Sequence, residues 1–359
     1  MTNAESQNCS PGILPAHQHF IDWMKAVGMF LIVFGHVVGA PFNQFTQPIY
    51  PKQLGVAFFV FITAWSLAND GRSRWRILFH RLFPVYFYGM CLALLLSSLF
   101  FLLKDDTNPS NYLPFFLGIN VLFNNFPANP TTWYVGTYLH LLLFWCFFLR
   151  DRTIATKHVL FVLVCEIAVR SLLVTIEKSY IAYMLLPNWG TVFLLGFLWF
   201  RKGDEANRGP LSYLLPLWLG CFALWAYVTN AVGFDTSFPF RKLSEGFVYP
   251  ALTQSLLVSF VYCLNTILFF AIARRLPPLR MVSFFSRNTL IIFLAHMPLI
   301  YGLAPWFYSF FETTFVKKAV LICTLYVGLA LISEAINKIL NIKALKARVW
   351  HEIESKLAL

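Results

Sequence analysis

Charged residues are scarce in this chain, because only 12% of its 359 residues are Asp, Glu, Lys or Arg while 58% are hydrophobic. A water-soluble domain carries about 25% charged residues, so soluble packing cannot bury this much apolar surface. The net charge is +12, yet no basic block is interleaved with polar side chains that could read bases. This argues against a nucleic-acid partner. The composition predicts an all-α integral membrane protein in contact with the lipid bilayer.

Three other features are absent. The seven cysteines show no metal-site spacing, so we expect no metal ligands and no permanently bound cofactor. Residues 1–19 are polar and lack a positively charged segment and a cleavage site, so we expect no removable signal peptide. No internal repeat is visible, which disfavours a transporter built from repeated halves.

Apolar runs divide the chain into a bundle of about ten predicted transmembrane helices. They are at about 20–40, 53–69, 78–103, 133–149, 158–176, 181–200, 211–231, 249–272, 288–308 and 319–340. A further apolar stretch at 112–126 is short for a span and lies between Asn/Pro-rich segments. We expect it to be re-entrant or interfacial, because a full span there would invert every later helix.

The distribution of Lys and Arg orients these spans. With the N-terminus inside, nineteen Lys or Arg residues fall on the cytoplasmic side and seven on the outer side. We therefore expect both termini in the cytoplasm, with a polar tail at 1–19, a transmembrane domain at 20–340 and a basic tail at 341–359. The last segment fits equally an amphipathic helix on the inner leaflet or the frayed end of the last span.

Two ionisable residues share one face of the first predicted span. Lys25 and His36 are eleven residues apart, which is almost three helical turns and roughly 16 Å along the axis. Ionisable side chains inside a span are costly and often functional. Lys25 also fits a lysine that extends to the cytoplasmic interface, and Asp22 can pair with it. His36 fits either a packed core histidine or a general base in the outer part of the bilayer.

Further polar residues mark other spans. Basic residues at the cytoplasmic start of the third span fit ordinary positive-inside charge or a clamp for phosphate, and they are Arg72, Arg74, Arg76 and Arg81. Glu166 and Arg170 are one turn apart in the fifth span, where they can neutralise each other or line a substrate cavity.

Trp133 fits an interfacial aromatic belt. Asn288 stands at the predicted start of the ninth span. His296 stands in the middle of that span, where it fits either a packed core histidine or a functional one.

In this order, the segments resemble the membrane acyltransferase family 3, which includes bacterial O-acetylases of lipopolysaccharide O-antigen, capsule and peptidoglycan. The family's signature of a basic residue, ten residues and a histidine is matched by DWMKAVGMFLIVFGH, which contains Lys25 and His36. Its R-x-x-P element is matched by Arg81 to Pro84. Its outer tryptophan motif and its late span are similar to 133–135 and 288–298. The resemblance covers about residues 20–340.

The sequence departs from the family pattern in places. Residues 62–64 are Ile-Thr-Ala instead of the usual Ser-Gly. Leu78 stands where the family usually has a second arginine, and Arg76 could take the place of that arginine. Tyr138 stands where many relatives carry an acidic residue. A lysine at position 25 with Asp22 upstream resembles the branch that contains the fucose and exopolysaccharide acetylases.

The resemblance implies an acyl-CoA-dependent O-acetyltransferase in the cell (inner or plasma) membrane. It would transfer an acyl group, most often acetyl from acetyl-CoA, to a hydroxyl of a cell-surface or exported polysaccharide. His36 would be the general base, with an acyl-histidine intermediate as a second route. The acyl donor would contact Lys25, Arg74, Arg76 and Arg81. Contacts to the substrate or the oxyanion would come from Trp133, Asn288 or His296, with support from Asp22, Glu166 and Arg170.

A second hypothesis is a secondary transporter or glycan flippase. Its relay of ionisable groups would be Lys25, His36, Glu166 and Arg170. The sequence leaves open the acceptor sugar, the acyl group and whether the chain forms a homo-oligomer.

Overall fold

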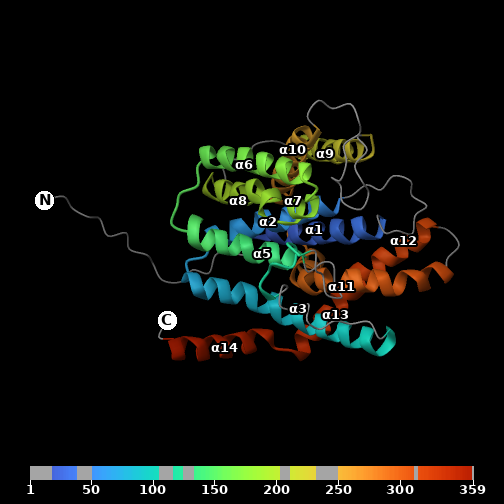
Figure 1. The fold of residues 1–359 in the computed structure, drawn as a ribbon. Helices are drawn as coiled ribbons and strands as arrows, with labels where there is room; N and C mark the ends of the chain where they lie inside the picture. The colour runs from blue at the N-terminus through green and yellow to red at the C-terminus, as the bar shows by residue number, and fades with distance from the viewer. Residues whose placement is uncertain are drawn as a thin grey trace.

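The computed structural model describes residues 18–38, 51–104, 116–123, 133–202, 211–231, 250–310 and 314–357. The elements in these ranges are helices, which confirms the all-α prediction for this part of the chain (Figure 1). In chain order they are α1 (His19–Val38), α2 (Lys52–Ala68), α3 (Arg74–Lys104), α5 (Trp133–Phe144), η3 (Trp145–Leu149), α6 (Thr156–Thr175), α7 (Ser179–Met184), η4 (Leu186–Asn188), α8 (Gly190–Lys202), α9 (Leu211–Ala231), α10 (Pro250–Ala273), α11 (Arg280–Phe310), α12 (Thr314–Cys323), η6 (Thr324–Gly328), α13 (Leu329–Ile339) and α14 (Ile342–Leu357).

Six helical stretches within the described ranges are long and apolar enough to cross a membrane, and three shorter apolar helices accompany them. The six are His19–Val37, Arg74–Leu95, Thr156–Thr175, Ala251–Ala273, Arg280–Ile300 and Phe315–Ile339. Large apolar side chains such as Phe161 and Val164 of α6 are 70% and 66% exposed, as expected for a surface in contact with lipid. The chain is therefore a multi-pass membrane protein. The count of ten spans and the cytoplasmic position of both termini stay predictions.

α2 is a central helix that packs against α1, α8 and α10. Glycines bring the backbones together: a methyl group on Gly55 of α2 would collide with the carbonyl oxygen of Gly28 in α1. Gly196 of α8 lies equally close to the backbone of Phe61 in α2. Such close approach is the usual way that helices associate in lipid, where burial of apolar surface gives little driving force. The glycines thus fix α1 against a buried helix.

α1 and α11 lie side by side and run in the same direction. At one end of the pair, Asp22 of α1 accepts hydrogen bonds of 2.6 Å from the hydroxyls of Ser283 and Ser286 in α11. At the other end, His36 of α1 meets His296 of α11. Polar contacts between helices are favourable in lipid, because each polar group would otherwise lack a partner. The two contacts set the register in which the site is built.

Two predicted elements need correction. The span at 181–200 is wrong as one helix, because the chain breaks between α7 and α8, where Pro187 cannot donate a backbone hydrogen bond. Asn188 turns inward there, and its side-chain amide donates to the carbonyl oxygen of Tyr183 over 2.9 Å. The placement of Asn288 at a helix start is also wrong, because α11 begins at Arg280. Of the stretch at 112–126, residues 116–123 are described, and they form mainly turns rather than a membrane-spanning helix.

The C-terminal tail forms a helix of its own. Leu340 is extended and separates α13 from α14, so the frayed-end alternative is wrong. α14 lies beside α3 (Figure 1). The N-terminal tail at 1–19 lies outside the described residues up to position 17.

Candidate active site

Two histidines from distant parts of the chain meet inside the bundle. Nε2 of His296 lies 3.4 Å from Nδ1 of His36. The His36 Nδ1 atom also lies 2.8 Å from the sulfur of Met297. His296 is fully buried, whereas His36 is half-buried. The structure therefore brings together the two intramembrane histidines that the sequence indicated.

The hydrogen bonds of His296 determine which ring nitrogens carry hydrogen. Its Nδ1 lies 2.7 Å from the carbonyl oxygen of Phe293 and 3.1 Å from that of Ile292, so this nitrogen is a donor. In a neutral imidazole, Nε2 of His296 is then an acceptor. It receives the hydrogen on Nδ1 of His36, which leaves Nε2 of His36 with a lone pair. A histidine held in one tautomer by a second group is the arrangement of a general base.

A cavity of about 210 Å³ lies along the same face of α1. Lys25 and Ile32 line it from α1, and Thr289 and Phe293 line it from α11. Ile32 is one turn before His36, and Phe293 is one turn before His296. Since α1 and α11 are parallel, the cavity wall ends about one helical turn from the histidine pair. Its mixed apolar and basic lining suits a ligand with an uncharged arm and an anionic end.

Two basic residues contribute to this cavity. Lys25 lies close enough to Asp22 and Arg81 for their charges to act on its ammonium group, so the predicted Asp22–Lys25 proximity is present. Arg81 of α3 lines the cavity together with Ser66 of α2. An Nη atom of Arg81 lies 3.8 Å from the carboxylate of Asp70. Of the four predicted donor-binding residues, Lys25 and Arg81 are thus in the cavity wall.

The turn between α2 and α3 anchors Arg81. Arg72 donates two hydrogen bonds of 2.8 and 2.6 Å to the two carboxylate oxygens of Asp70. Burial by itself would raise the pKa of Asp70, but the hydrogen bonds and charge of Arg72, with the charge of Arg81, hold that pKa below its ordinary value. Asp70 is therefore an anion that binds two arginines at this end of the cavity.

Arg74 and Arg76, the other two predicted donor contacts, lie outside the cavity wall. Arg74 is bound to Asp151 at the surface. Arg76 is exposed on the face of α3 that carries His80, one turn further along. The structure thus separates the predicted group of arginines into one that lines the cavity and two that face other surroundings.

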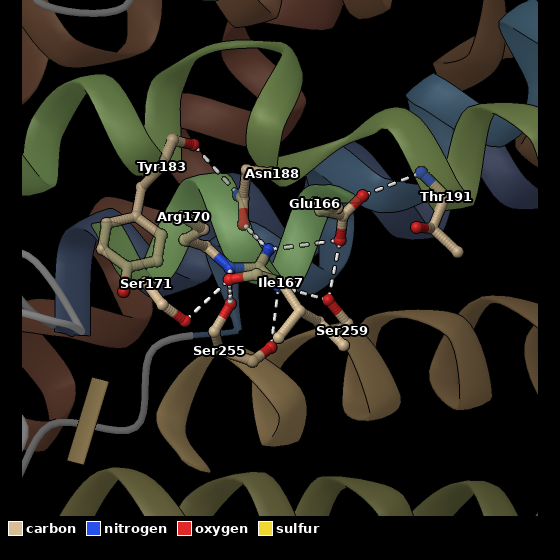
Figure 2. Close-up of polar contacts among 9 residues, drawn as sticks. All are labelled: Glu166, Ile167, Arg170, Ser171, Tyr183, Asn188, Thr191, Ser255 and Ser259. Carbon is tan, nitrogen blue, oxygen red and sulfur yellow. Dashed lines mark hydrogen bonds and ion pairs between the residues drawn. The ribbon is translucent and has the colours of Figure 1, made fainter. Parts of the chain in front are cut away.

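Glu166 and Arg170 form a buried pair away from the histidines, shown in Figure 2. Arg170 donates to Glu166, to Asn188, to Ser259 and to both the hydroxyl and the carbonyl of Ser255. Glu166 also accepts hydrogen bonds from the backbone N–H of Thr191 and from the hydroxyl of Ser259. A charge pair so fully satisfied fixes α6, α8 and α10 together. These two residues are thus placed as structural support, and they do not line the cavity.

Asn288 and Trp133 also lie outside the cavity wall. The carbonyl oxygen of the Asn288 side chain accepts from Ser333 over 2.7 Å, and its amide lies 3.2 Å from Glu334. Asn288 therefore ties α11 to α13. Trp133 stacks on Trp189 with 6.4 Å between ring centroids, at the start of α5. The polar atoms of Asn288 thus have partners within the protein, and the ring of Trp133 packs against another ring.

Sequence reasoning missed several residues around the site. Tyr134 and Tyr138 of α5 line the cavity, and the ring of Tyr134 contacts Phe293. Lys52, which falls just before the predicted span at 53–69, begins α2, and its charge acts on both His36 and His296. A spacing of four residues between the tyrosines was the available signal, since it places them on one helical face. No pattern in the sequence pointed to Lys52.

Comparison with known proteins gives one match. A family model described as an acyltransferase domain, from the acyltransferase 3 family, matches residues 18–334. This range contains α1 to α11, the histidine pair and the cavity, and it ends before α14. Searches of the curated proteins and of the solved structures return no match.

Proposed function

Because the chain belongs to the acyltransferase 3 family, we propose that it transfers an acetyl group from acetyl-CoA to a hydroxyl of a cell-surface or exported polysaccharide. The observation that carries the proposal is the pair of His36 and His296, located one turn beyond a cavity that Lys25 and Arg81 line. The enzyme would act from the cell membrane, with the CoA donor on the cytoplasmic side and the glycan on the outer side.

The chemistry starts at Nε2 of His36. This atom takes the proton of the sugar hydroxyl while the hydroxyl oxygen attacks the thioester carbonyl. His296 accepts the hydrogen on Nδ1 of His36 and so stabilises the imidazolium that forms. As the C–S bond breaks, the CoA sulfur leaves with the electron pair and receives the proton from His36. The products are the sugar ester and free CoA.

A positive charge near the reacting carbonyl would stabilise the oxyanion. Lys52 supports this role, because its backbone nitrogen lies against Gly35, the residue before His36, and its charge acts on both imidazoles. Of the three predicted oxyanion residues, Asn288 is bound to Ser333 and Glu334, Trp133 lies outside the cavity wall, and His296 is the partner of His36. We therefore assign the oxyanion contact to Lys52.

The acyl donor would enter from the side of Lys25 and Arg81. Their cationic groups would contact the phosphates of CoA, while the uncharged pantetheine arm would occupy the cavity along α1 toward His36. The pantetheine arm would extend over roughly 16 Å, which is the distance between Lys25 and His36 along α1. In this proposal Asp22 supports Lys25 through its contacts with α11.

Two measurements test the proposed function. Mass analysis of surface glycans from cells with and without this chain should show an added acetyl group only when the chain is present. The purified chain should also unfold at a higher temperature in the presence of CoA, because a ligand that binds the folded state stabilises it. If the glycans are unchanged and CoA does not raise the unfolding temperature, the results would contradict the proposed acyl transfer from acetyl-CoA. They would then favour the transporter alternative.

A further inference from the structure

α14 covers the first half of α3 with a tryptophan. Trp350 of α14 is 6% exposed, and its ring centroid lies 5.2 Å from that of Phe79 and 5.9 Å from that of His80. α14 begins at Ile342, beyond the matched family domain, which ends at residue 334. The interface between α3 and α14 is therefore a feature that the family assignment does not describe. Figure 1 shows the two helices lying along each other.

Positive charges meet at this interface. The positive charges of Lys346, Arg72 and Arg76 act on His80, opposed by the negative charge of Asp70. Arg72 is bound by Asp70, but no hydrogen bond or ion pair is formed by the side-chain nitrogens of Arg76 or Lys346 within the described residues. Partial burial, together with the charges of Arg72 and Lys343, lowers the pKa of Lys346, as expected for a cation among other cations. Like charges held together in this way favour a bound anion.

Two buried nitrogens at the same interface have no hydrogen-bond partner among the described residues. They are Nε1 of Trp350 and Nε2 of His80. The indole nitrogen of tryptophan is always a donor, so Trp350 needs an acceptor. A buried donor without an acceptor costs about 1–3 kcal/mol, which a ligand rich in acceptor oxygens would recover. Cations and orphaned nitrogens thus point to the same kind of ligand.

We propose that the interface between α3 and α14 binds a phosphate group, held by Arg76, Lys346, His80 and Trp350. Phosphate oxygens accept hydrogen bonds from guanidinium, ammonium, imidazole and indole N–H groups alike. The phosphate can come from the nucleotide end of acyl-CoA or from the headgroup of an anionic phospholipid. The first source rests on the proposed function. It is supported by Arg81, which follows His80 directly and lines the cavity on the adjacent face of α3.

Binding of adenosine 3′,5′-bisphosphate tests the nucleotide source, because this compound is the nucleotide end of CoA without the thiol arm. Binding is measured with the purified full chain in neutral phosphatidylcholine nanodiscs. We expect the dissociation constant to rise about tenfold in Lys346→Gln and in Arg76→Gln, since each substitution removes one charge-assisted hydrogen bond. Trp350→Phe keeps the aromatic packing on Phe79 but removes the indole donor, so it should weaken binding as well.

Lys356→Gln is the matched control, because Lys356 is on the same helix but pairs with Glu352. A second arm compares the unfolding temperature in phosphatidylcholine nanodiscs with that in phosphatidylglycerol nanodiscs. One outcome assigns the site to a lipid headgroup: phosphatidylglycerol raises the unfolding temperature, and the bisphosphate does not bind. In that case Lys346→Gln should lose the stabilisation by phosphatidylglycerol, and Lys356→Gln should keep it. If Lys346→Gln and Arg76→Gln respond like Lys356→Gln in both arms, the phosphate site is disproved.

The assay for acyl transfer is run on the same variants, which separates this inference from the proposed function. The phosphate site alone is overturned if Lys346→Gln keeps acylation with an unchanged Michaelis constant for acetyl-CoA and if phosphatidylglycerol does not change the unfolding temperature. Phosphate binding without any acyl transfer by the unaltered chain overturns the proposed function alone.

Discussion

Nε2 of His296 lies 3.4 Å from Nδ1 of His36, although 260 residues separate the two in the sequence. The second nitrogen of His296 is bound by backbone carbonyls of α11. His296 therefore has one fixed orientation, and it presents an acceptor to His36. The relationship makes His296 a positioning residue for the proposed base.

The orientation of His36 can be tested by replacing His296. In His296→Gln the side-chain oxygen can accept the hydrogen of His36 Nδ1 in place of the imidazole, whereas His296→Leu offers no acceptor. We expect kcat of acyl transfer to fall about 10²-fold in the leucine variant and less in the glutamine variant. The pH–rate profile should shift in both, because the basicity of His36 changes. Equal activity of the two variants would contradict the positioning role. His140→Gln is the control, because His140 of α5 does not line the cavity.

The donor end of the cavity can be tested through Lys25 and Arg81. We expect Lys25→Met and Arg81→Gln each to raise the Michaelis constant for acetyl-CoA about tenfold with little change in kcat, because they remove a contact to donor phosphate. Arg74→Gln is the matched control, since Arg74 is bound to Asp151 outside the cavity. An effect of Arg74→Gln equal to that of Arg81→Gln would show that general surface charge, rather than the cavity, attracts the donor.

The buried pair of α6 should govern stability. Arg170→Met leaves Glu166 as an unpaired buried charge, so we expect the free energy of unfolding to fall by about 3–5 kcal/mol. The double variant Glu166→Gln with Arg170→Met removes both charges and should be more stable than Arg170→Met alone. Thermal unfolding in detergent measures the difference. A double variant that is less stable than the single one would contradict the assignment of this network as a satisfied charge pair.

Acid should weaken the turn between α2 and α3. The pKa of Asp70 is lower in the folded chain than its ordinary value of 3.8, so its contribution to stability is complete above that value. This contribution is lost as the pH falls through the folded pKa, because the protonated carboxyl group no longer attracts Arg72. We expect Asp70→Asn to be less stable than the unaltered chain at pH 7, with a difference that shrinks as the pH falls through the folded pKa of Asp70, which lies below 3.8. A stability difference that is independent of pH would contradict this role.

The all-helical, multi-pass membrane class and some residues of the candidate site could be predicted from the sequence. Apolar runs located the helices, since hydrocarbon length sets their extent. The spacing of Lys25 and His36 placed both on one face of α1, and in the structure Lys25 lines the cavity while His36 lies about one turn beyond its last α1 lining residue, Ile32. These inferences depend on one helix at a time, which is why local patterns suffice for them.

The remaining parts depend on contacts between helices. The pairing of His36 with His296 follows from the register of α1 and α11, which Asp22 and its serine partners set. The break before α8 was masked by apolar residues around Pro187, although a proline followed by Asn188 was a visible signal. Inward rotation of Asn188 is stabilised by Arg170 of another helix, which no local pattern reveals.

Acyl transfer by His36→Ala tests the central claim most directly. Membranes that contain this variant are incubated with labelled acetyl-CoA and glycan acceptor, and stabilisation by CoA verifies that the protein is folded and binds its donor. We predict that the variant still responds to CoA but transfers no acetyl group. Transfer at the rate of the unaltered chain would contradict His36 as the base.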